Sequence, residues 1–377
     1  MRVHQQSLES NSLDIELCDF DPGLILLFIS PGYANPQALL DKLHRLYPNA
    51  DITGCSTSGE IIDTTVEDNS VVINMLKFEK TRHIIKSVEL TDKVDSQEAG
   101  KLLFESLASD DLQHILILSD GLVVNGADLV VGLAKGGVDK VGITGGLAGD
   151  GTDFNETFTI ENAKILKGCV TGIGLYGTDL HVNYSSLGGW DSFGIERKVT
   201  KSDKSVLYEL DGKPALDLYK SFLGPHAADL PASALLFPLS LRTSESEDPL
   251  VRTILAVNEE DKSMTFAGNI PEGAYVRLMK ANIDRLIKGA EGSAEISKSS
   301  MKSEAEFALL ISCVGRRLVL KQCVEEEIEA VRDVLGKRPF ISGFYSYGEL
   351  APFGKFQPCQ LHNQTMTITT FSERAAS

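Results

Sequence analysis

The chain has 377 residues, a formal net charge of −17 and 42% hydrophobic residues, which is typical of a globular protein with room for two domains. The acidic excess argues against nucleic acid and anionic membrane surfaces as partners, because both are bound through Lys and Arg side chains. Apolar runs such as ILIL at 115–118 are too short to cross a bilayer, and the first residues lack the apolar segment of a secretion signal, so we expect a cytoplasmic protein.

The first predicted unit of structure is a strand, a helix and a second strand. LILLFIS at 24–30 has the length and continuous apolar character of a buried strand. Asn35-Pro36 is a helix-start signal, and the helix predicted over 35–48 carries its leucines on one face. The unit ends in ITGCSTSGE at 52–60, a loop of small residues closed by a glycine and an acidic residue.

The same order of elements occurs twice more. The corresponding strand, helix and loop are 115–121, 125–137 and 143–150 in the second copy, and 307–315, 320–336 and 341–349 in the third. The three loops read ITGCSTSGE, ITGGLAGD and ISGFYSYGE, so each has Ile-[Ser/Thr]-Gly followed, after three or four residues, by Gly-[Glu/Asp]. We therefore predict one unit written three times.

A strand–helix–strand crossover makes its two strands parallel, so each loop lies just beyond the carboxyl end of a strand. In open α/β sheets that end is where ligands bind. Further apolar strands follow the loops, at 70–78, 170–177 and 364–371, and are predicted as antiparallel additions. The predicted fold class is α/β, with mixed α+β character: repeated strand–helix–strand units in mixed sheets.

The segment between the second and third units has a different pattern from the three units. Short strands and polar turns over 233–268 indicate an antiparallel meander, with helices predicted at 214–224 and 280–292. We place the domain boundary near 223–227. The predicted domains are residues 20–222, with two units, and residues 223–372, with the meander and the third unit.

The three loops share an acidic residue, which is Glu60, Asp150 or Glu349. Two interpretations are open for these carboxylates: hydrogen bonding to neighbouring backbone N–H groups, or contact with a ligand. The predicted ligand-binding residues are Gly54, Cys55, Ser56, Thr57, Gly59, Glu60, Gly145, Gly146, Gly149, Asp150, Tyr345, Ser346, Gly348, Glu349, His362 and Asn363.

An enzyme with a Cys55 or Ser56 nucleophile is the alternative, because GCSTSG is similar to the nucleophile motif G-x-S-x-G. However, Ser58 stands where the second glycine belongs, and no helix is predicted after the loop. The other two loops carry Gly146 and Phe344 at the position of Cys55. We therefore expect no covalent catalysis by Cys55 or Ser56. The six cysteines are scattered without metal-ligand spacing, so we expect reduced thiols.

Strand alternation in LHNQTMTITT places His362 on the same face as apolar residues, pointing inward. A lone inward histidine is either a hydrogen-bonded core residue or a metal ligand, and both interpretations stay open. His226 and His181 are the alternatives for a metal ligand.

Taken in order, GCSTSGEI, ITGGLAGDG, LPASALLFPL, VRTILAV, FAGNIPEG, ISGFYSYGELAPF and LHNQT resemble the FIST sensory module over about residues 20 to 372. In length the chain is similar to the haem-binding, nitric-oxide-sensing (NosP-type) members. The resemblance implies a cytoplasmic sensor, rather than an enzyme, that binds b-type haem and nitric oxide. It also implies a partner histidine kinase in two-component and cyclic-di-GMP signalling.

A haem needs an axial His, Cys, Met or Tyr ligand. His362 is the first choice because it is predicted to point inward beside the third loop, with His226 and His181 as alternatives. The second interpretation of the same resemblance is a sensor of another small molecule, such as an amino acid. Whether the protein is a monomer or a homodimer is left open.

Overall fold

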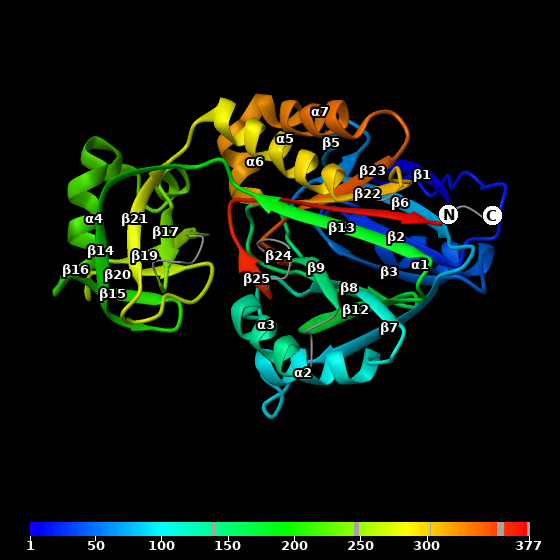
Figure 1. The fold of residues 1–377 in the computed structure, drawn as a ribbon, viewed down its shortest axis with the longest axis horizontal. Coiled ribbons are helices and arrows are strands. Elements are labelled where there is room, and N and C mark those ends of the chain that lie inside the picture. Colours follow the sequence, from blue (N-terminus) through cyan, green and yellow to red (C-terminus); the bar gives the residue numbers. More distant parts are fainter. Residues whose placement is uncertain (137–140, 245–248, 302, 353–357, 375–377) are drawn as a thin grey trace.

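The computed structural model describes residues 1–136, 141–244, 249–301, 303–352 and 358–374. Figure 1 shows a large body of strands with helices around it, and a smaller lobe beside it that contains one antiparallel sheet. The predicted mixed α/β class is confirmed. Among the described residues, no helix combines the length and apolar character needed to cross a membrane.

All three predicted units are present in the body. Their parallel strand pairs are β2 (Leu24–Ile29) with β3 (Asp51–Ser56), β8 (Leu112–Ser119) with β9 (Gly142–Leu147), and β22 (Phe307–Cys313) with β23 (Phe340–Ser346). The connecting helices are α1 (Pro36–Leu46), α3 (Gly126–Lys135) and α7 (Val324–Leu335). The predicted antiparallel additions are β6 (Ser70–Lys77), β12 (Cys169–Tyr176) and β26 (Met366–Glu373). Helices α2 (Ser96–Leu107) and α6 (Val314–Leu320) were not predicted.

The strand that follows each Gly-[Glu/Asp] loop pairs with a different unit, which the sequence did not indicate. Strand β4 (Glu60–Ile62) of the first unit pairs with β23 of the third. Strand β24 (Gly348–Pro352) of the third unit pairs with β9 of the second. Strand β10 (Thr159–Glu161) of the second unit pairs with β3 of the first. The exchange is cyclic, so the separation of any one unit from the other two breaks backbone hydrogen bonds in two of the sheets.

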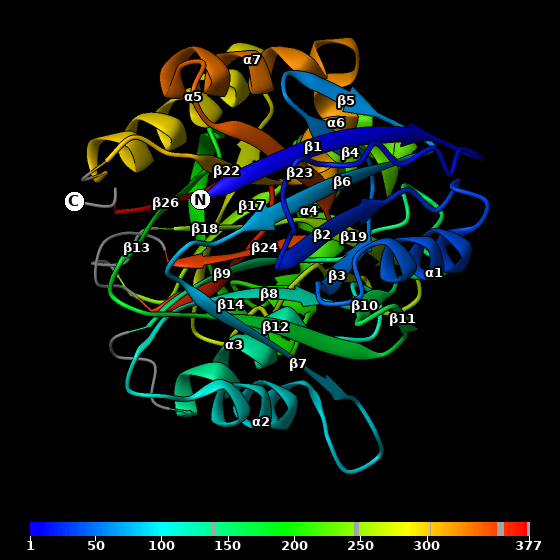
Figure 2. The ribbon, with the colours of Figure 1, turned by 90° about the vertical axis from the view of Figure 1, so that its right-hand side faces the viewer.

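The three six-stranded sheets consequently have the same plan. Each has an edge strand, which is β1 (Arg2–Glu9), β7 (Arg82–Glu89) or β13 (Leu180–Leu187). At the other edge lies a short strand, which pairs with the strand donated by another unit (β10, β24 or β4). These short strands are β11 (Lys164–Leu166), β25 (Cys359–His362) and β5 (Thr65–Glu67). Figure 2 shows the helices at three places around the strands: α1, then α2 with α3, and α5 (Ile283–Ser299) with α7.

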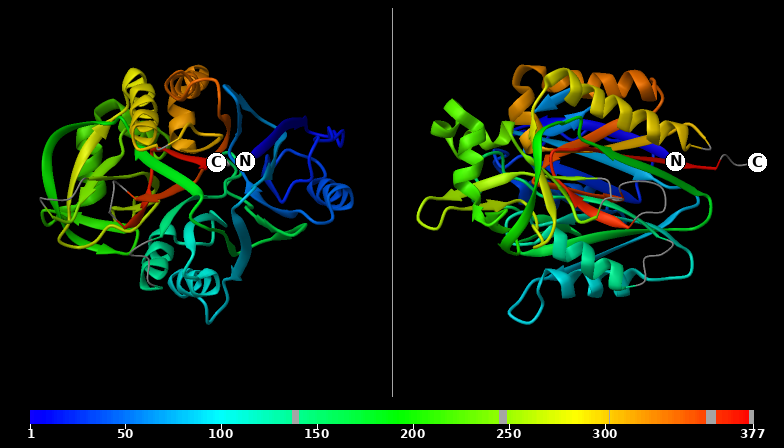
Figure 3. Two further views of the ribbon diagram at one scale, coloured as in Figure 1. Left: turned by 45° about the vertical axis from the view of Figure 1, so that its right-hand side comes forward. Right: turned by 60° about the vertical axis from the view of Figure 1, so that its left-hand side comes forward.

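The sheets enclose a common core to which every unit contributes. Phe28, Leu118 and Ile311 come from the first strands of the three units and are buried together. Phe28 also contacts Phe344, with the ring centroids 4.9 Å apart. At the rim of the body the amino group of Met1 lies 3.3 Å from the Glu373 carboxylate, so the two ends of the described chain meet (Figure 3).

The first glycine of each loop motif has a packing reason that is common to the three units. A Cβ atom on Gly54, Gly145 or Gly343 would lie within about 2 Å of a carbonyl oxygen of the neighbouring parallel strand, which belongs to Leu27, Ile117 or Leu310 respectively. A methyl group there would force two backbones apart, and a close-packed core resists such a shift.

Gly343→Ala is therefore expected to lower the free energy of unfolding by about 3 kcal/mol. The added Cβ would lie 1.8 Å from the Leu310 oxygen. Gly292→Ala is the matched control, because this glycine lies within α5 and its Cβ would meet only the flexible end of Leu187, at 3.3 Å. Urea unfolding of both variants measures the difference. Equal stabilities of the two variants would contradict the packing account.

The small lobe is inserted between β13 and α5. Its elements are β14 (Asp191–Asp203), β15 (Val206–Leu210), β16 (Lys213–Pro214), α4 (Ala215–Leu223), the 3-10 helices Gly224–Asp229 and Ala232–Leu236, β17 (Leu239–Arg242), β18 (Leu250–Arg252), β19 (Ile254–Asn258), β20 (Ser263–Phe266) and β21 (Tyr275–Lys280). The predicted antiparallel meander and both flanking helices are present. However, β14 and β15 belong to the same sheet, so in space the lobe spans Asp191 to Lys280, and the predicted boundary at 222 and 223 lies inside it.

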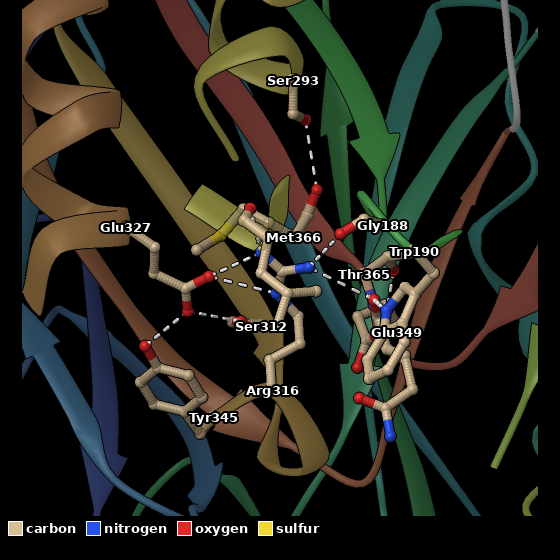
Figure 4. Close-up of polar contacts among 12 residues, drawn as sticks. Gly188, Trp190, Ser293, Ser312, Arg316, Glu327, Tyr345, Glu349, Thr365 and Met366 are labelled. Atoms are coloured by element: carbon tan, nitrogen blue, oxygen red, sulfur yellow. Dashed lines mark hydrogen bonds and ion pairs between the residues drawn. The ribbon is translucent and has the colours of Figure 1, made fainter. Parts of the chain in front are cut away.

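A buried ion pair holds the two segments that connect the lobes (Figure 4). The guanidinium of Arg316 in α6 contacts the carboxylate of Glu327 in α7 at 2.7 Å, and neither side chain is accessible to solvent. The same guanidinium donates to the carbonyl of Gly188, before the small lobe, and to that of Leu286, after it, at 2.8 Å. Both chain segments that connect the two lobes are thus hydrogen-bonded to one side chain.

Candidate functional site

The three predicted loops meet in the body, but they pack against one another. The backbone N–H of Gly149 donates to Ser56, that of Tyr345 donates to Gly59, and that of Tyr347 donates to Leu147, at 2.9 to 3.1 Å. Neighbouring side chains fill the space beside the glycines of the loops. A Cβ atom on Gly146 would lie 2.7 Å from Ile311 Cγ2, one on Gly149 would meet Ser58, and one on Gly348 would meet Leu361. These loops form a packed centre.

Glu60 and Glu349 occupy equivalent positions in the first and third loops. Each carboxylate accepts from a hydroxyl three residues earlier, on Thr57 or on Ser346 (2.7 Å). Each also accepts from a hydroxyl that follows the loop, on Ser70 (2.7 Å) or Thr365 (2.9 Å). Burial raises the pKa of Glu60 to about 7 and that of Glu349 to about 8. These contacts are the ones expected of carboxyls that organise a turn.

Asp150 binds backbone in the second loop. Its carboxylate accepts from the N–H groups of Phe154, Asn155 and Glu156 at 2.7 to 3.0 Å, and from the hydroxyl of Tyr347. A carboxylate with this many donors is satisfied without a ligand. Asp150 therefore fixes the shape of the loop that follows it.

Other residues of the first and third loops also make their contacts within the protein. Cys55 lies in the common core, and burial raises the pKa of its thiol, which keeps it in the weakly nucleophilic protonated form. Ser56 Oγ accepts from the Phe158 N–H at 3.1 Å. Tyr345 is buried, and its hydroxyl donates to Glu327 at 2.7 Å. None of these contacts places a nucleophile at an open surface.

A cavity of about 670 Å³ lies instead between the body and the small lobe. On the body side it lies beyond the carboxyl ends of β8, β9 and β22, and its wall is formed by 121–126, Leu147, Thr152, Phe154, 313–315, Leu318, Tyr347 and Asn363. On the small-lobe side the wall is formed by Ser205, 229–232, Leu235, 253–255 and 265–268. The volume and the apolar character are typical of a small-molecule site.

Two polar side chains in this wall lack hydrogen-bond partners among the described residues. Asn363 is 1% exposed, and within the described chain neither its amide oxygen nor its amide nitrogen is paired. Thr253 is 4% exposed, and its hydroxyl is likewise unpaired there. Buried polar groups are nearly always paired, because leaving one unpaired costs about 1–3 kcal/mol. Two such groups, one from each lobe, in the wall of one cavity indicate a ligand site.

Hydrogen bonds beside the cavity join the lobes. Asn269 of the small lobe accepts from the side chain of Asn125 at 3.2 Å and donates to Asp128 at 3.0 Å, at the beginning of α3. Arg252 of the small lobe donates to the carbonyl of Leu361 in the body at 3.1 Å. A molecule in the cavity therefore lies next to the contacts that set the position of one lobe against the other.

None of the three predicted histidines is placed to ligate a haem in this cavity. His362 is buried with a pKa lowered by that burial to about 4, but its Nε2–H donates to the Ala351 carbonyl at 2.9 Å, and the residue is not part of the cavity wall. His226 lies on the surface against Phe237, and His181 lies on the edge strand β13 beside Arg374. The described residues contain no cluster of three or more His, Cys, Asp or Glu arranged for a metal ion.

Two wall residues have atoms that can ligate haem, Cys313 and Tyr347. Burial raises the pKa of the Cys313 thiol, whereas haem is ligated by the thiolate. Burial and the contact with Asp150 raise the pKa of Tyr347, whose hydroxyl already donates to that carboxylate. Neither group is prepared to coordinate iron.

Of the predicted ligand-binding residues, Asn363 is the one that the structure places in the cavity wall. The wall of the small lobe was not predicted as a site, although its segments belong to motifs that carry the family resemblance: LPASALLFPL, VRTILAV and FAGNIPEG contribute Leu230, Thr253 and Phe266, among others. Their apolar side chains gave no chemical signal. Only the meeting of two lobes makes them a wall.

Thr253→Val is expected to leave the free energy of unfolding unchanged or to raise it by about 1 kcal/mol, because valine has the same shape and removes an unpaired hydroxyl. Thr53→Val is the matched control. Its hydroxyl donates to the Ile160 carbonyl at 2.9 Å, so its loss is expected to cost about 1 kcal/mol. Chemical unfolding measures both. A loss of stability in Thr253→Val as large as in the control would show that Thr253 is not an unpaired site residue.

Comparison with known proteins gives matches over most of the chain. The family model of the FIST N domain matches residues 23–213, and that of the FIST C domain matches residues 215–352. An uncharacterized protein of Methanocaldococcus jannaschii is 24% identical over 339 residues, which cover 83% of this chain and 63% of the relative, so the chain spans less than two thirds of that protein. A crystal structure of cyanuric acid hydrolase from A. caulinodans covers 99% of both chains at 7% identity, with a TM-score of 0.38, too low for any inference.

Proposed function

The chain belongs to the FIST family, and on this basis we propose that it is a sensor that binds a small molecule in the cavity between the body and the small lobe. The observation that carries this proposal is the pair of polar side chains without partners in the described chain, Asn363 and Thr253, in a largely apolar wall. Ligand pockets combine apolar walls with a few polar groups that orient the ligand.

The proposed signal is a change in the position of the lobes. A ligand shifts such an equilibrium only by as much as its affinity differs between the two states. Both lobes contribute to the cavity. A bound molecule therefore contacts both walls only when the lobes are as close together as they are in this structure. The hydrogen bonds that Asn269 and Arg252 make between the lobes would then form or break according to whether the cavity holds a ligand.

We propose binding without turnover. The buried, protonated Cys55 thiol and the hydrogen-bonded loop carboxyls support this, because neither is placed against the cavity. The haem and nitric oxide implied by the resemblance are not part of the proposal, because the predicted histidines lie outside the cavity wall and the described wall residues Cys313 and Tyr347 are not prepared to coordinate iron. A histidine kinase as partner, and cytoplasmic residence, stay predictions from the resemblance. Capture of a purified kinase that depends on ligand occupancy would test the former.

The experiment is retention of small molecules from a cell extract by the purified protein, read by mass spectrometry. Ala267→Trp, which fills the cavity from the small lobe, is the comparison. We expect a molecule that co-elutes with the natural protein and not with Ala267→Trp. Retention by neither, or equally by both, would overturn the proposal.

Added hemin is a separate arm of the same experiment. A Soret band that is lost in Cys313→Ala or Tyr347→Phe would restore haem as the ligand.

A further inference from the structure

We infer that the ligand of this cavity is an uncharged molecule that presents an amide N–H next to its carbonyl on an apolar body. The inference rests on the proposed function, since it concerns the same cavity. It follows from the charge of the wall, from the chemistry of the polar groups that lack partners in the described chain, and from the apolar side chains of the wall.

The described part of the wall offers no cation to a ligand. Among the described residues that line the cavity, Asp229 is the only Asp, Glu, Lys, Arg or His, and it is acidic. Arg252 lies behind the wall, beside Gly268, and its guanidinium donates to backbone carbonyls of Asn269, Val251 and Leu361. A carboxylate held against this wall would lose hydration without gaining a counter-charge, which is unfavourable. Amino acids, whose carboxylate would meet no cation in the described wall, and ligands with a net negative charge are therefore poor candidates.

The unpartnered groups require both a donor and an acceptor from the ligand. Within the described chain, the Asn363 carboxamide has one unpaired acceptor and one unpaired donor side by side. A carboxylate has acceptors only and would leave the amide oxygen of Asn363 unpaired. An N–H next to a carbonyl pairs with both, in the way that asparagine reads the edge of adenine. The Thr253 hydroxyl provides a third hydrogen bond, from the opposite lobe.

In the structure these polar atoms are shielded from solvent, so pairing with a ligand requires rotation of the two side chains. The rotated state is favoured only when a ligand supplies the missing partners. Binding is in this way coupled to a rearrangement in both walls at once.

The rest of the ligand meets apolar and aromatic surface. Phe154 and Tyr347 are stacked with ring centroids 4.8 Å apart, and both belong to the wall. Val123, Phe154 and Leu255 are between 47% and 61% exposed although they are large apolar residues. Exposed apolar side chains gathered at one cavity are typical of a binding site for an apolar group.

The test compares quinolin-2(1H)-one with its N-methyl derivative by calorimetry, because methylation removes only the N–H. We expect the natural protein to bind the lactam roughly tenfold more tightly than the N-methyl compound. The preference is expected to vanish in Asn363→Leu, and binding of both is expected to be lost in Ala267→Trp. Thr253→Val, a variant expected to be stable, weakens lactam binding several-fold and keeps the test decisive where Asn363→Leu does not fold.

L-Phenylalanine is the charged comparison. Equal affinity for the lactam and its N-methyl derivative, or tighter binding of phenylalanine than of the lactam, would overturn the amide inference while the sensor proposal stood. If these compounds and every molecule of the extract fail to bind the natural protein, the sensor proposal itself falls.

Discussion

Replacement of Arg316 by methionine is expected to lower the free energy of unfolding by about 3–5 kcal/mol, because it leaves the Glu327 carboxylate buried without its counter-charge. The guanidinium and the carboxylate are both 0% exposed and lie 2.7 Å apart (Figure 4). Glu327 would keep the hydrogen bonds from Ser312 (3.1 Å) and Tyr345 (2.7 Å), which cannot replace the charge.

The same variant is expected to make the chain segments that connect the two lobes more mobile. Arg316 donates to carbonyls of Gly188, Leu286 and Gln364, and the Gln364 carbonyl also accepts from the Trp190 indole at 2.9 Å. Loss of these bonds frees the segment before the small lobe. Limited proteolysis of Arg316→Met is therefore expected to cut near 188–190 faster than in the natural protein.

Two controls separate the ion pair from side-chain loss in general. Arg338→Met removes an exposed pair with Glu304, which is expected to cost less than about 1 kcal/mol. The double variant Arg316→Met with Glu327→Leu is expected to recover part of the loss, because no unpaired charge remains. If Arg316→Met cost no more than Arg338→Met, the buried pair would not be a determinant of stability.

Glu349→Gln is expected to remove a component of the pH dependence of stability. Burial raises the pKa of this carboxyl from 4.5 to about 8 in the folded protein. Between these values the folded state holds a proton that the unfolded state has lost. Stability from this group is therefore full below about pH 4.5 and declines as the pH rises towards 8, by about 1.4 kcal/mol per pH unit.

Glutamine imitates the protonated carboxyl, so its variant should lack this decline while it keeps the contacts with Ser346 and Thr365. Urea unfolding at several values between pH 5 and pH 8 gives the slopes. Glu196→Gln is the control: its pKa is lowered by the hydrogen bond from Arg242, so it does not titrate in this range. Parallel slopes for Glu349→Gln and the natural protein would show that Glu349 is ionised in the fold.

The sequence predicted the parallel strand pairs of the body and the helices that connect them, because buried strands and amphipathic helices have local patterns. It did not predict which unit each donated strand would join. Strand β4 has three residues and begins at Glu60, whereas its partner β23 begins at Phe340. Strand β10, equally short, begins at Thr159 and pairs with β3, which begins at Asp51. No local pattern in so short a strand specifies a partner that is so distant along the chain.

The site was less predictable than the fold. Asn363 was predicted as a ligand residue from its motif, but Thr253 was not, because an isolated threonine in a strand carries no signal. That both groups are unpaired within the described chain depends on what two separate lobes place around them. The same holds for Glu60 and Glu349: the repeat revealed the carboxyls, and only the packed structure shows that hydroxyl groups occupy their oxygen atoms.

The cyclic exchange of strands has a consequence for synthesis on the ribosome. Every strand of the first sheet has been made once residue Leu166 has emerged. The second sheet, begun at Arg82, keeps an open edge until β24 and β25 arrive, and β25 ends at His362. A chain that stops prematurely near its C-terminus therefore leaves an unpaired strand edge in its N-terminal half, where it can pair with other chains.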